Sequence, residues 1–341
     1  MITGASAGVG RALTRDLARR GASLALLARG LEGLDAARRE AECSGARVLA
    51  VVADVADAAA VEAAAERVER ELGPIDVWVN NAMVSVFSPI AQMTPEEFER
   101  VTRVTYLGAV HGTLAALRRM QPRDRGTIVQ VGSALAYRGI PLQSAYCAAK
   151  HALQGFTESL RAELRHDGSR IHVTMVHFPA LNTPQFDWTR SRMPRQPQPV
   201  PPIFQPELAA DAIVWAVEHP RPEVLVGWPT VKAVFGNSLM PWYVDRYLAR
   251  FGYDAQQTDE PVSPHRPDNL FAPISRDYGA HGRFDSRARS TSAEWWMARH
   301  RAAAFVGMMA IGATAALAAL RRRARASSVE RDGVVMVVGG R

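Results

Sequence analysis

The sequence predicts an α/β fold, a doubly wound parallel sheet with helices on both faces. Short aliphatic and β-branched runs alternate with helical stretches up to about residue 228, and strands separated by helices form parallel βαβ units. A glycine-rich turn also stands directly before the first helical stretch. The strands are expected at residues 24–28, 48–53, 75–79, 127–131, 172–176 and 224–226.

The helices between these strands have recognisable ends. Gly21, Gly45 and Gly73 each follow a helical stretch, where a glycine commonly ends a helix. The motif Thr-Pro-Glu-Glu at residues 94–97 matches a capping box with proline in the first turn. A long helix is therefore expected to begin there.

The first strand is the exception to this regular pattern. Only Met1 and Ile2 precede Thr3, although the first strand of such a sheet needs about five residues. We therefore expect a truncated strand in the centre of the sheet, with weak folding and weak ligand binding as the consequence. The simplest explanation is that the natural start lies upstream, and an upstream extension is then expected to restore both.

The charge of the chain is concentrated at its C-terminal end. There are 41 basic and 34 acidic residues, but residues 281–341 alone hold 11 arginines and four acidic residues, and the rest of the chain is neutral. A neutral body argues against nucleic acid as a partner, whereas a basic tail suits an anionic surface. Two cysteines cannot build a disulfide framework or a cysteine zinc cluster, and the histidines lack metal-ligand spacing, so no metal is expected.

Composition divides the chain into four parts. Residues 1–253 form the main domain, in which the proline-rich segment 184–206 is expected to act as a lid. Residues 254–298 form a polar extension, residues 299–323 a candidate transmembrane helix, and residues 324–341 a basic, disordered tail. We see no internal repeat.

The candidate transmembrane helix contains 19 residues without charge, 302–320, between arginine-rich flanks and near Trp295 and Trp296. At about 1.5 Å per residue it reaches ~28 Å, close to the thickness of the hydrocarbon core. Nine of the 19 residues are alanine, so insertion is only modestly favourable. We expect a single-pass anchor that holds the body at the cytoplasmic face of a membrane, because no secretory signal is seen. An alanine-rich soluble helix is the alternative.

The glycine-rich turn reads Thr3-Gly4-x-x-x-Gly8-x-Gly10 and opens the first helix. Glycines let backbone N–H groups approach a pyrophosphate, and the helix N-terminus adds partial positive charge. Taken alone, this motif is equally compatible with an ordinary turn of small residues.

Three further motifs stand where strands end. Arg29 follows Ala28 at the place where an NAD site carries an acid, and its guanidinium suits a 2′-phosphate; a solvated surface arginine is the alternative. Asp54 and Val55 follow the next strand, at the ligand edge of such a sheet, and are equally explained as a helix cap. The Asn-Asn-Ala motif at residues 80–82 offers two amides for a ribose, with a simple turn as the alternative.

The most specific pattern combines Ser133, Tyr146 and Lys150. Ser133 follows a strand, and Tyr146 and Lys150 lie four apart in a helical pattern, so they share one face. A phenol with a pKa near ~10 is a poor base at neutral pH, and a nearby ammonium favours the phenolate. The serine hydroxyl can then hold a substrate oxygen. Tyr-x-x-x-Lys alone is more often a pair on a helix surface.

Together, these motifs resemble the short-chain dehydrogenase/reductase family over about residues 1–250, in order and in spacing. The resemblance implies a Rossmann sheet with NAD(P) bound across its carboxyl edge. It implies that Tyr146 is the general acid/base, that Lys150 holds the nicotinamide ribose and lowers the tyrosine pKa, and that Ser133 positions the substrate oxygen. The cofactor-binding positions that it implies are Thr3, Gly4, Ser6, Gly8, Val9, Gly10, Arg29, Asp54, Val55, Asn80, Ala82, Tyr146, Lys150, Pro179 and Thr183.

The sequence departs from the family pattern at several positions. Thr105 stands where the family often has an asparagine that retains a water for proton relay, and we expect the threonine to hold this water through fewer bonds. Met83 follows Asn-Asn-Ala in place of glycine, and Ala180 replaces a glycine beside the expected nicotinamide site.

The sequence thus predicts an NADP(H)-dependent oxidoreductase that transfers a hydride between nicotinamide and a small-molecule carbonyl or secondary alcohol. The alternative is a catalytically weak or inactive member of the same fold that senses a nucleotide or acts as a membrane scaffold. The expected anchor favours a lipophilic substrate. A homodimer through helices 94–120 and 144–165 is implied by the resemblance alone.

Overall fold

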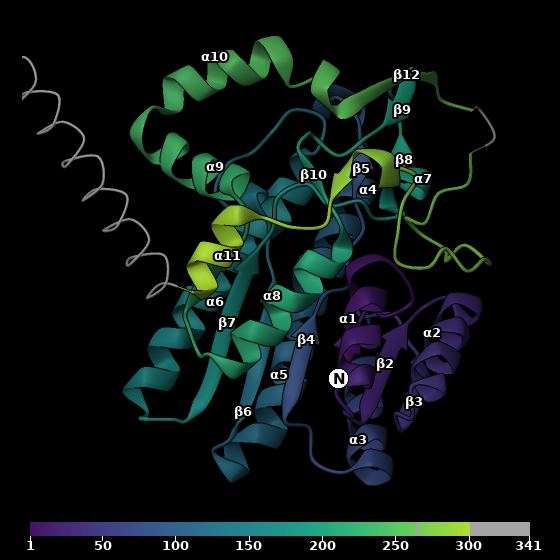
Figure 1. The fold of residues 1–341 in the computed structure, drawn as a ribbon, viewed down its shortest axis with the longest axis vertical. Helices are drawn as coiled ribbons and strands as arrows, with labels where there is room; N and C mark the ends of the chain where they lie inside the picture. Colours follow the sequence, from purple (N-terminus) through teal and green to yellow (C-terminus); the bar gives the residue numbers. More distant parts are fainter. Residues whose placement is uncertain (264–265, 301–341) are drawn as a thin grey trace, which may run out of the picture. The chain divides into compact units, whose positions relative to one another are not determined.

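The computed structural model describes residues 1–263 and 266–300 (Figure 1). Two compact units are present, Met1–Ser292 and Ala293–Arg341. The second contributes one described helix, α11 (Ala293–Arg299). Everything that follows on the sheet and its cavity concerns the first unit.

A seven-stranded, all-parallel sheet forms the centre of the first unit, in the order β11-β7-β6-β4-β1-β2-β3. All six strands expected from the sequence are present, with ends shifted by no more than two residues, and the predicted α/β fold is confirmed. The strands are β1 (Ile2–Thr3), β2 (Leu24–Ala28), β3 (Val48–Val52), β4 (Val77–Asn80), β6 (Gly126–Val131), β7 (Ile171–His177) and β11 (Glu223–Leu225).

The short first strand does take the central place in the sheet. Ile2 is paired with Leu26 of β2 on one side and Val79 of β4 on the other. The carbonyl of Met1 also accepts a hydrogen bond from the Val79 amide at 2.8 Å. Ile2 is only 1% exposed, so this strand is fully enclosed by its neighbours and by the helices above and below.

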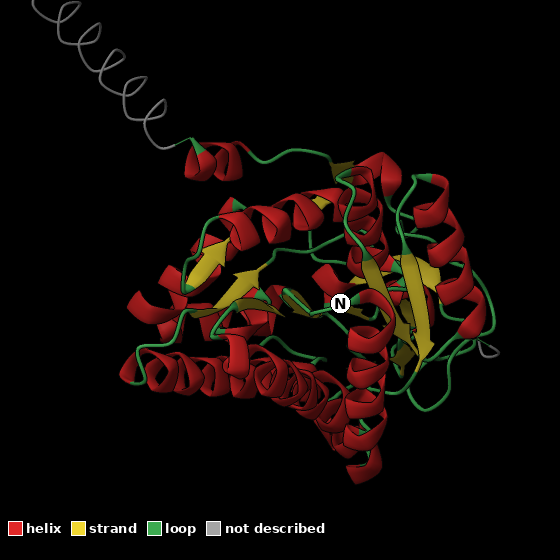
Figure 2. Cartoon of the chain, turned by 90° about the horizontal axis from the view of Figure 1, so that it is seen from below, coloured by secondary structure: helices red, strands yellow, loops and turns green. Residues whose placement is uncertain are grey.

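Helices cover both faces of the sheet (Figures 1 and 2). On one face α1 contacts α2 and α8, and on the other α3 contacts α5, with α6 against β7. The expected long helix that starts at residue 94 is divided into α4, a π-helical segment Thr102–Leu107, and α5. The bounds are α1 Gly8–Arg19, α2 Leu31–Cys43, α3 Ala58–Leu72, α4 Pro95–Val101, α5 Gly108–Met120, α6 Ser144–His166 and α8 Pro206–Glu218.

The lid and the polar extension are joined by short pairs of strands. Within the expected lid, β8 pairs with β5, β9 with β12 and β10 with β13, and a helical turn, α7 (Gln185–Trp188), precedes them. Residues 254–292 therefore fold back onto the body and belong to the same compact unit. The strands are β5 Val86–Phe87, β8 Arg190–Ser191, β9 Arg195–Pro197, β10 Ile203–Phe204, β12 Gln257–Pro261 and β13 Ala288–Arg289.

Two helices, α9 (Trp228–Leu239) and α10 (Pro241–Phe251), follow the last strand of the sheet and form a hairpin. Among residues 1–263 and 266–300, no helix is both long enough and apolar enough to cross a bilayer. The uncharged segment 302–320, on which the predicted anchor rests, and the predicted tail 324–341 lie outside the described residues.

Candidate active site

A cavity of about 460 Å³ lies where the parallel strands end. Its wall takes residues from just after six different strands, as expected for the carboxyl edge of such a sheet. These residues are Gly4, Arg29, Asp54, Asn81, Ser133 and Phe178. We distinguish the β6 end, which holds Ser133, from the β2–β3 end, which holds Arg29 and Asp54.

The glycine-rich turn forms the wall between these two ends. Gly4 has φ +66°, and a Cβ there would lie 2.8 Å from the Ala82 Cα, so only glycine fits this close approach. Ser6, Gly8 and Val9 line the cavity at the start of α1. The first turn of α1 has no side-chain cap and no acidic residue. Apart from the Gly8 amide, which donates to the Gly279 carbonyl at 3.1 Å, its N–H groups and its partial positive charge are thus available to an anion.

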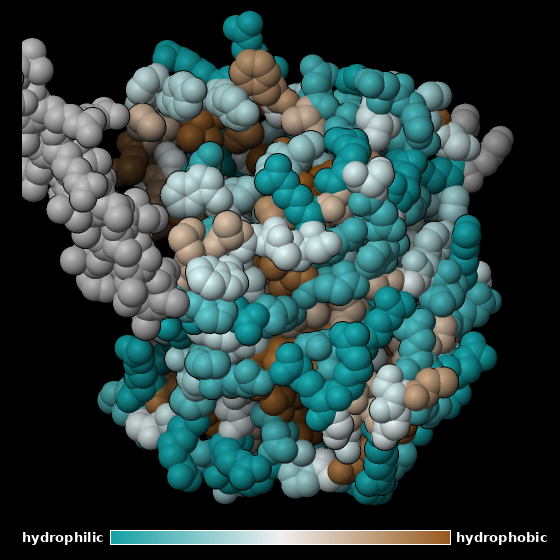
Figure 3. Space-filling model, in the orientation of Figure 1, coloured by the Kyte–Doolittle hydropathy of each residue, from teal (hydrophilic) through white to brown (hydrophobic). Residues whose placement is uncertain are grey.

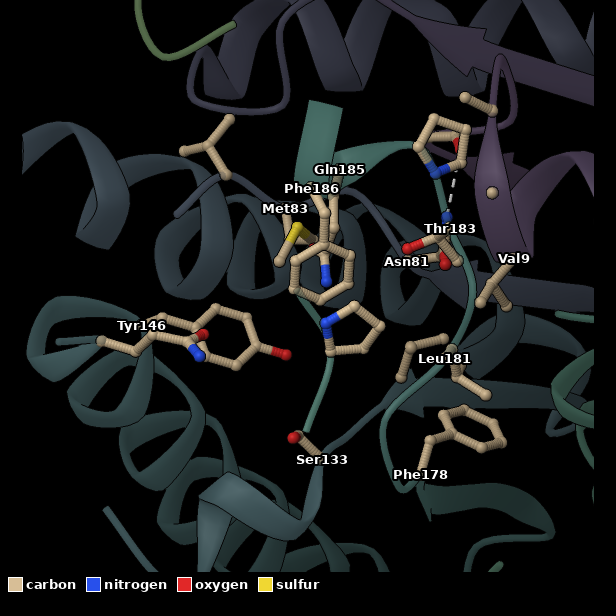
Figure 4. A pocket seen from close by; sticks show the side chains of 18 of the residues that line it. Val9, Asn81, Met83, Ser133, Tyr146, Phe178, Leu181, Thr183, Gln185 and Phe186 are labelled. Carbon is tan, nitrogen blue, oxygen red and sulfur yellow. Dashed lines mark hydrogen bonds between the residues drawn. The ribbon is translucent and has the colours of Figure 1, made fainter. Parts of the chain in front are cut away.

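At the β6 end, Tyr146 and Lys150 both lie on α6 and line the cavity with Ser133. Figure 4 shows the Tyr146 phenol and the Ser133 hydroxyl on the same side of the cavity. The Lys150 ammonium is 5.6 Å from the centre of the Tyr146 ring and donates a hydrogen bond to the Val131 carbonyl at 2.6 Å. The side chain of Lys150 is buried, and the carbonyl at the end of β6 holds its charged group. The i, i+4 spacing in α6 thus produces the predicted cluster.

Burial governs the ionisation of this cluster. It raises the pKa of the Tyr146 phenol above its ordinary value, while a hydrogen bond with Ser133 acts in the opposite direction. Burial also lowers the pKa of Lys150 from 10.5 to about 8. The net shift of the Tyr146 pKa is therefore opposite to the one expected from the sequence, because the loss of hydration outweighs the favourable contacts of the phenol.

At the β2–β3 end, the guanidinium of Arg29 is already engaged. It donates to the carbonyls of Asn269 at 2.6 Å and Phe271 at 3.3 Å. These residues belong to a segment of the polar extension, residues 269–282, which we call the strap. Arg29 still lines the cavity, but it faces the strap as well as any ligand. The alternative of a solvated surface arginine is therefore wrong, since the Arg29 side chain is 18% exposed, and its contact with a 2′-phosphate stays a prediction.

The strap is fixed to the body at several points. Leu270 is fully buried in the main hydrophobic core. Arg11, fully buried in α1, bonds to Glu40 at 2.8 Å and to Asp277 of the strap at 3.2 Å. The Gly8 amide donates to the Gly279 carbonyl at 3.1 Å. From the strap, the residues that line the cavity are Asn269, Pro273, Ile274, Arg276 and Tyr278.

Asp54 lines the cavity but is paired within the protein. Its carboxylate accepts from Arg100 at 2.5 Å and from the Ala56 amide at 2.9 Å. Burial would raise the pKa of Asp54, but the Ala56 amide and Arg100 outweigh it and hold this pKa below its ordinary value. Of the two possibilities that the sequence left open, Asp54 is a cavity residue and not the helix cap, because Asp57 caps α3.

Of the other predicted site residues, most lie on the cavity wall and four lie behind it. Those on the wall, beyond residues already placed, are Val55, Ala82, Pro179 and Thr183. Thr3 ties β1 to the next loop by accepting from the Asn81 and Ala82 amides. Gly10 allows α1 to approach the turn, since a Cβ there would lie 2.2 Å from the Gly4 oxygen.

Asn80 points away from the cavity into a buried polar network. Its amide bonds to Trp78, Thr113 and Gln130 at 2.8–3.0 Å. The next residue, Asn81, lines the cavity instead, and its amide donates to the Gly4 carbonyl at 3.1 Å. Of the two amides that the motif offers, the structure thus places only that of Asn81 on the cavity wall. Neighbouring side chains along a strand point to opposite sides, and this alternation was the signal in the sequence that could have distinguished Asn80 from Asn81.

Thr105 also lies behind the wall, within the π-helical segment. Its hydroxyl donates to the Val84 carbonyl at 2.9 Å and accepts from the Val84 amide at 3.1 Å. The residue is only 1% exposed. One acceptor lone pair of the hydroxyl remains, so Thr105 could hold the water expected from the sequence only by accepting a hydrogen bond from it.

A buried network that sequence reasoning missed supports Ser133. The Nδ1 atom of His177 lies 3.0 Å from the Ser133 carbonyl oxygen, and the ring of Tyr137 is 5.0 Å from the ring of His177. Burial lowers the pKa of His177 to about 4, so the ring is neutral at pH 7 and Nδ1 donates to this carbonyl. No sequence motif predicts this contact, because β7 and the loop that contains Ser133 come together only when the sheet forms.

Comparisons with known proteins agree with this geometry. The family model described as short chain dehydrogenase matches residues 1–193. An uncharacterised oxidoreductase of Bacillus subtilis, YxnA, is 34% identical over 273 residues, which are 80% of this chain and 77% of that protein. A 3-dehydrosphinganine reductase of Danio rerio is 30% identical over 222 residues, 63% of this chain and 66% of that protein.

Two solved structures are similar as well. A short-chain dehydrogenase from Streptomyces avermitilis matches with TM-score 0.61 and 26% identity, covering 74% of this chain and 97% of that one. An alcohol dehydrogenase from Thermococcus sibiricus, complexed with 5-hydroxy-NADP, matches with TM-score 0.57 and 26% identity, covering 66% and 94%. The chain therefore belongs to the short-chain dehydrogenase/reductase family and is an NAD(P)-dependent oxidoreductase.

Proposed function

We propose that this protein reduces a lipophilic carbonyl compound to a secondary alcohol, or catalyses the reverse reaction, with NADP(H) as its cofactor. One observation carries the proposal: Ser133, Tyr146 and Lys150 meet at one end of a cavity whose wall also contains an uncapped, glycine-rich helix start. The first group suits proton transfer at an oxygen, and the second suits a pyrophosphate.

The cavity fits a dinucleotide in two respects. The first turn of α1 leaves N–H groups for phosphate oxygens, and the glycine-rich turn removes the side chains that would block their approach. At the β6 end, Pro179 follows Phe178, whose carbonyl accepts from the Ala134 amide at 3.1 Å beside Ser133, and the nicotinamide would lie there. Thr183 lines the same cavity at the glycine-rich turn, where a Cβ on Gly8 would be 3.3 Å from it. When bound, the nicotinamide supplies or accepts the hydride.

We assign the proton to Tyr146. Because burial raises its pKa, the phenol stays protonated at neutral pH and can donate its proton to a substrate oxygen. The Ser133 hydroxyl, beside the phenol in Figure 4, would hold that oxygen. The Lys150 ammonium would hold a ribose hydroxyl and stabilise the phenolate that remains after the transfer.

The β2–β3 end favours NADP(H) over NAD(H). Arg29 brings a guanidinium group to this end, Arg276 of the strap lines the same cavity, and Ala28 leaves no acid for a ribose 2′-hydroxyl. The nearby carboxylate of Asp54 is bound by Arg100. A 2′-phosphate would therefore meet more positive than negative charge.

The cavity lining contains many apolar side chains, which supports a lipophilic substrate. They include Ile140, Phe178, Phe186, Trp188 and Val200. The similarity to a 3-dehydrosphinganine reductase favours the same class. We also propose that residues 302–320 anchor the protein to a membrane, on the strength of their length and lack of charge.

The test is NADPH oxidation across a panel of ketones of increasing chain length, compared with NADH at equal concentration. We expect turnover with NADPH, and kcat/KM that rises with chain length. NADPH binding without turnover of any carbonyl or alcohol would contradict the assignment. Salt washing tests the anchor: the full chain should stay with membranes at high salt, whereas a chain ending at Ser292, the end of the first compact unit, should be released by the salt.

A further inference from the structure

The outer face of α9 is apolar where a helix on a soluble protein is usually polar. Trp228, Lys232, Phe235 and Leu239 are spaced by four, three and four residues, so they form one stripe along the helix. Trp228 is 55% exposed, Phe235 58% and Leu239 75%. The inner side of α9 is tied to the body instead, where the Asn237 amide donates to the Tyr137 carbonyl at 2.9 Å.

The following helix, α10, extends this apolar surface. None of its residues is buried. Tyr243, Tyr247 and Phe251 form one stripe, and Trp242 lies beside it; these four side chains are 48–59% exposed. In Figure 3, the region of α9 and α10 shows a few brown side chains among pale and teal ones. We call the exposed side chains of residues 228–251 the hairpin surface.

The charges of the hairpin surface are almost all positive. Residues 228–251 contain Lys232, Arg246 and Arg250 against one acid, Asp245. That acid is ion-paired with Arg138 of the body. The three cations lie over aromatic rings of the same surface, at 5.9, 5.4 and 5.5 Å from the ring centres. The surface thus combines Trp and Tyr with Lys and Arg, as segments at a bilayer interface do.

The hairpin surface is continuous with the wall of the cavity. Tyr247, Leu248 and Phe251 of α10 and Pro229 of α9 line the cavity. Tyr247 and Phe251 are therefore exposed outside and also border the space that leads to Ser133. A molecule that reached this surface from an apolar phase would meet the cavity without passing through water.

We propose that the hairpin surface docks on the surface of an anionic lipid bilayer and opens the cavity toward it. The proposal goes beyond the proposed function, because docking requires neither catalysis nor the segment 302–320. A bilayer fits better than a second copy of the chain. Lysine is depleted in interfaces between proteins, whereas here Lys232 lies in the middle of the apolar stripe, and basic side chains beside anionic headgroups are favourable.

The test uses the full chain and follows amide hydrogen exchange segment by segment. Phosphatidylcholine vesicles with about 30% phosphatidylserine provide the anionic surface. We expect exchange across residues 228–251 to slow about tenfold on adding these vesicles, and less with phosphatidylcholine alone or at high salt. Exchange of residues 302–320 is measured separately, so that membrane binding by the anchor and by the hairpin surface can be distinguished.

Paired variants identify the side chains responsible. F235S/L239S should remove most of this roughly tenfold protection of residues 228–251, because each lost side chain removes apolar burial. The control I90S/L114S removes two other exposed apolar side chains, 66% and 43% exposed, and should behave as the unmodified chain does.

Three results would overturn the proposal. Exchange across residues 228–251 that vesicles do not change would exclude docking, whatever happens at residues 302–320. Protection that appears without vesicles and grows with protein concentration would assign the surface to a second copy. Protection without vesicles that is independent of concentration, and that is lost in the chain ending at Ser292, would assign it to the chain's own C-terminal segment.

Discussion

The two ends of the cavity are built in different ways. At the β6 end, Ser133, Tyr146 and Lys150 come from one strand and the helix that follows it. At the β2–β3 end, Arg29 contacts Asn269, which lies 240 positions away in the sequence. A short stretch of chain therefore determines the proposed chemistry. The wall around the proposed 2′-phosphate site depends instead on the strap, which is distant in the sequence and folds back.

The two ends of the cavity are also held in place by different kinds of structure. The β6 end rests on α6 and on the end of β6, two regular elements whose geometry is fixed by their own hydrogen bonds. The strap has no regular structure over most of its length and is fixed by Leu270, Asp277 and Gly279. Changes at the β6 end should therefore affect turnover, and changes in the strap should affect stability and cofactor affinity.

The largest effect is expected from Tyr146→Phe. The phenol is the group we assign as proton donor, and removing such a group costs about 10²–10⁴-fold in rate. Turnover should therefore be almost lost, while the dissociation constant for NADPH changes less than about twofold, since only one hydroxyl at the far end is removed. Steady-state kinetics and fluorescence titration give the two values. A variant with more than half of the normal activity would show that another group moves the proton.

The strap is tested by two neighbouring residues of opposite burial. Leu270 is 0% exposed and Phe271 51%. Leu270→Ala should lower the free energy of unfolding by about 2–5 kcal/mol, because it leaves a cavity in the core. Phe271→Ala should change it by less than about 0.5 kcal/mol. Denaturant unfolding measures both. Equal effects would mean that the strap is not fixed through Leu270.

Cofactor choice is tested at Arg276, which lies on the strap and whose guanidinium is 5.0 Å from the Tyr278 ring. Arg276→Ala should weaken NADPH binding about tenfold, as expected when one charge-assisted hydrogen bond is lost, and should leave NADH binding nearly unchanged. Arg118→Ala, a change at a 59% exposed arginine paired with Glu62 on α3, is the control. An equal loss for both cofactors would argue for a general structural role of Arg276.

The smallest effect is expected from a change of pH, which alters kcat/KM through the ionisation of Lys150. Its pKa is lowered by burial to about 8, so the ammonium is present below that pH and is lost above it. The Tyr146 pKa is raised, so the phenol stays protonated in the same range. The value of kcat/KM for NADPH in the reduction should therefore fall as the pH rises through about 8. In Lys150→Arg the charge persists, and the falling limb should move to higher pH or disappear.

Alternation of strands and helices was enough to predict the sheet, because each segment carries its own periodicity and its own end signals. All six predicted strands are present, and the central place of β1 is filled by Ile2 and Thr3. The Tyr146 and Lys150 pair was equally predictable, since a spacing of four residues fixes two side chains on one helix face.

The sequence could not choose between neighbouring or hidden polar groups. Asn80 and Asn81 are the same residue type, and only the direction of β4 sends one into the core and the other into the cavity. The sequence indicated that Thr105 holds a water, but its hydroxyl already donates to the Val84 carbonyl and accepts from the Val84 amide. The hydrogen-bond partners of these side chains depend on which groups the fold brings near them.

What the sequence determined by itself is the parallel sheet, the glycine-rich turn and the cluster at the β6 end, because these follow from local spacing. Only the tertiary structure decided that the strap engages Arg29, that Asp54 is paired with Arg100, and that burial raises the pKa of Tyr146. The physical reason is the same in each case: hydration and pairing of a charged or polar group are set by atoms far away in the sequence, which folding brings to within a few ångströms.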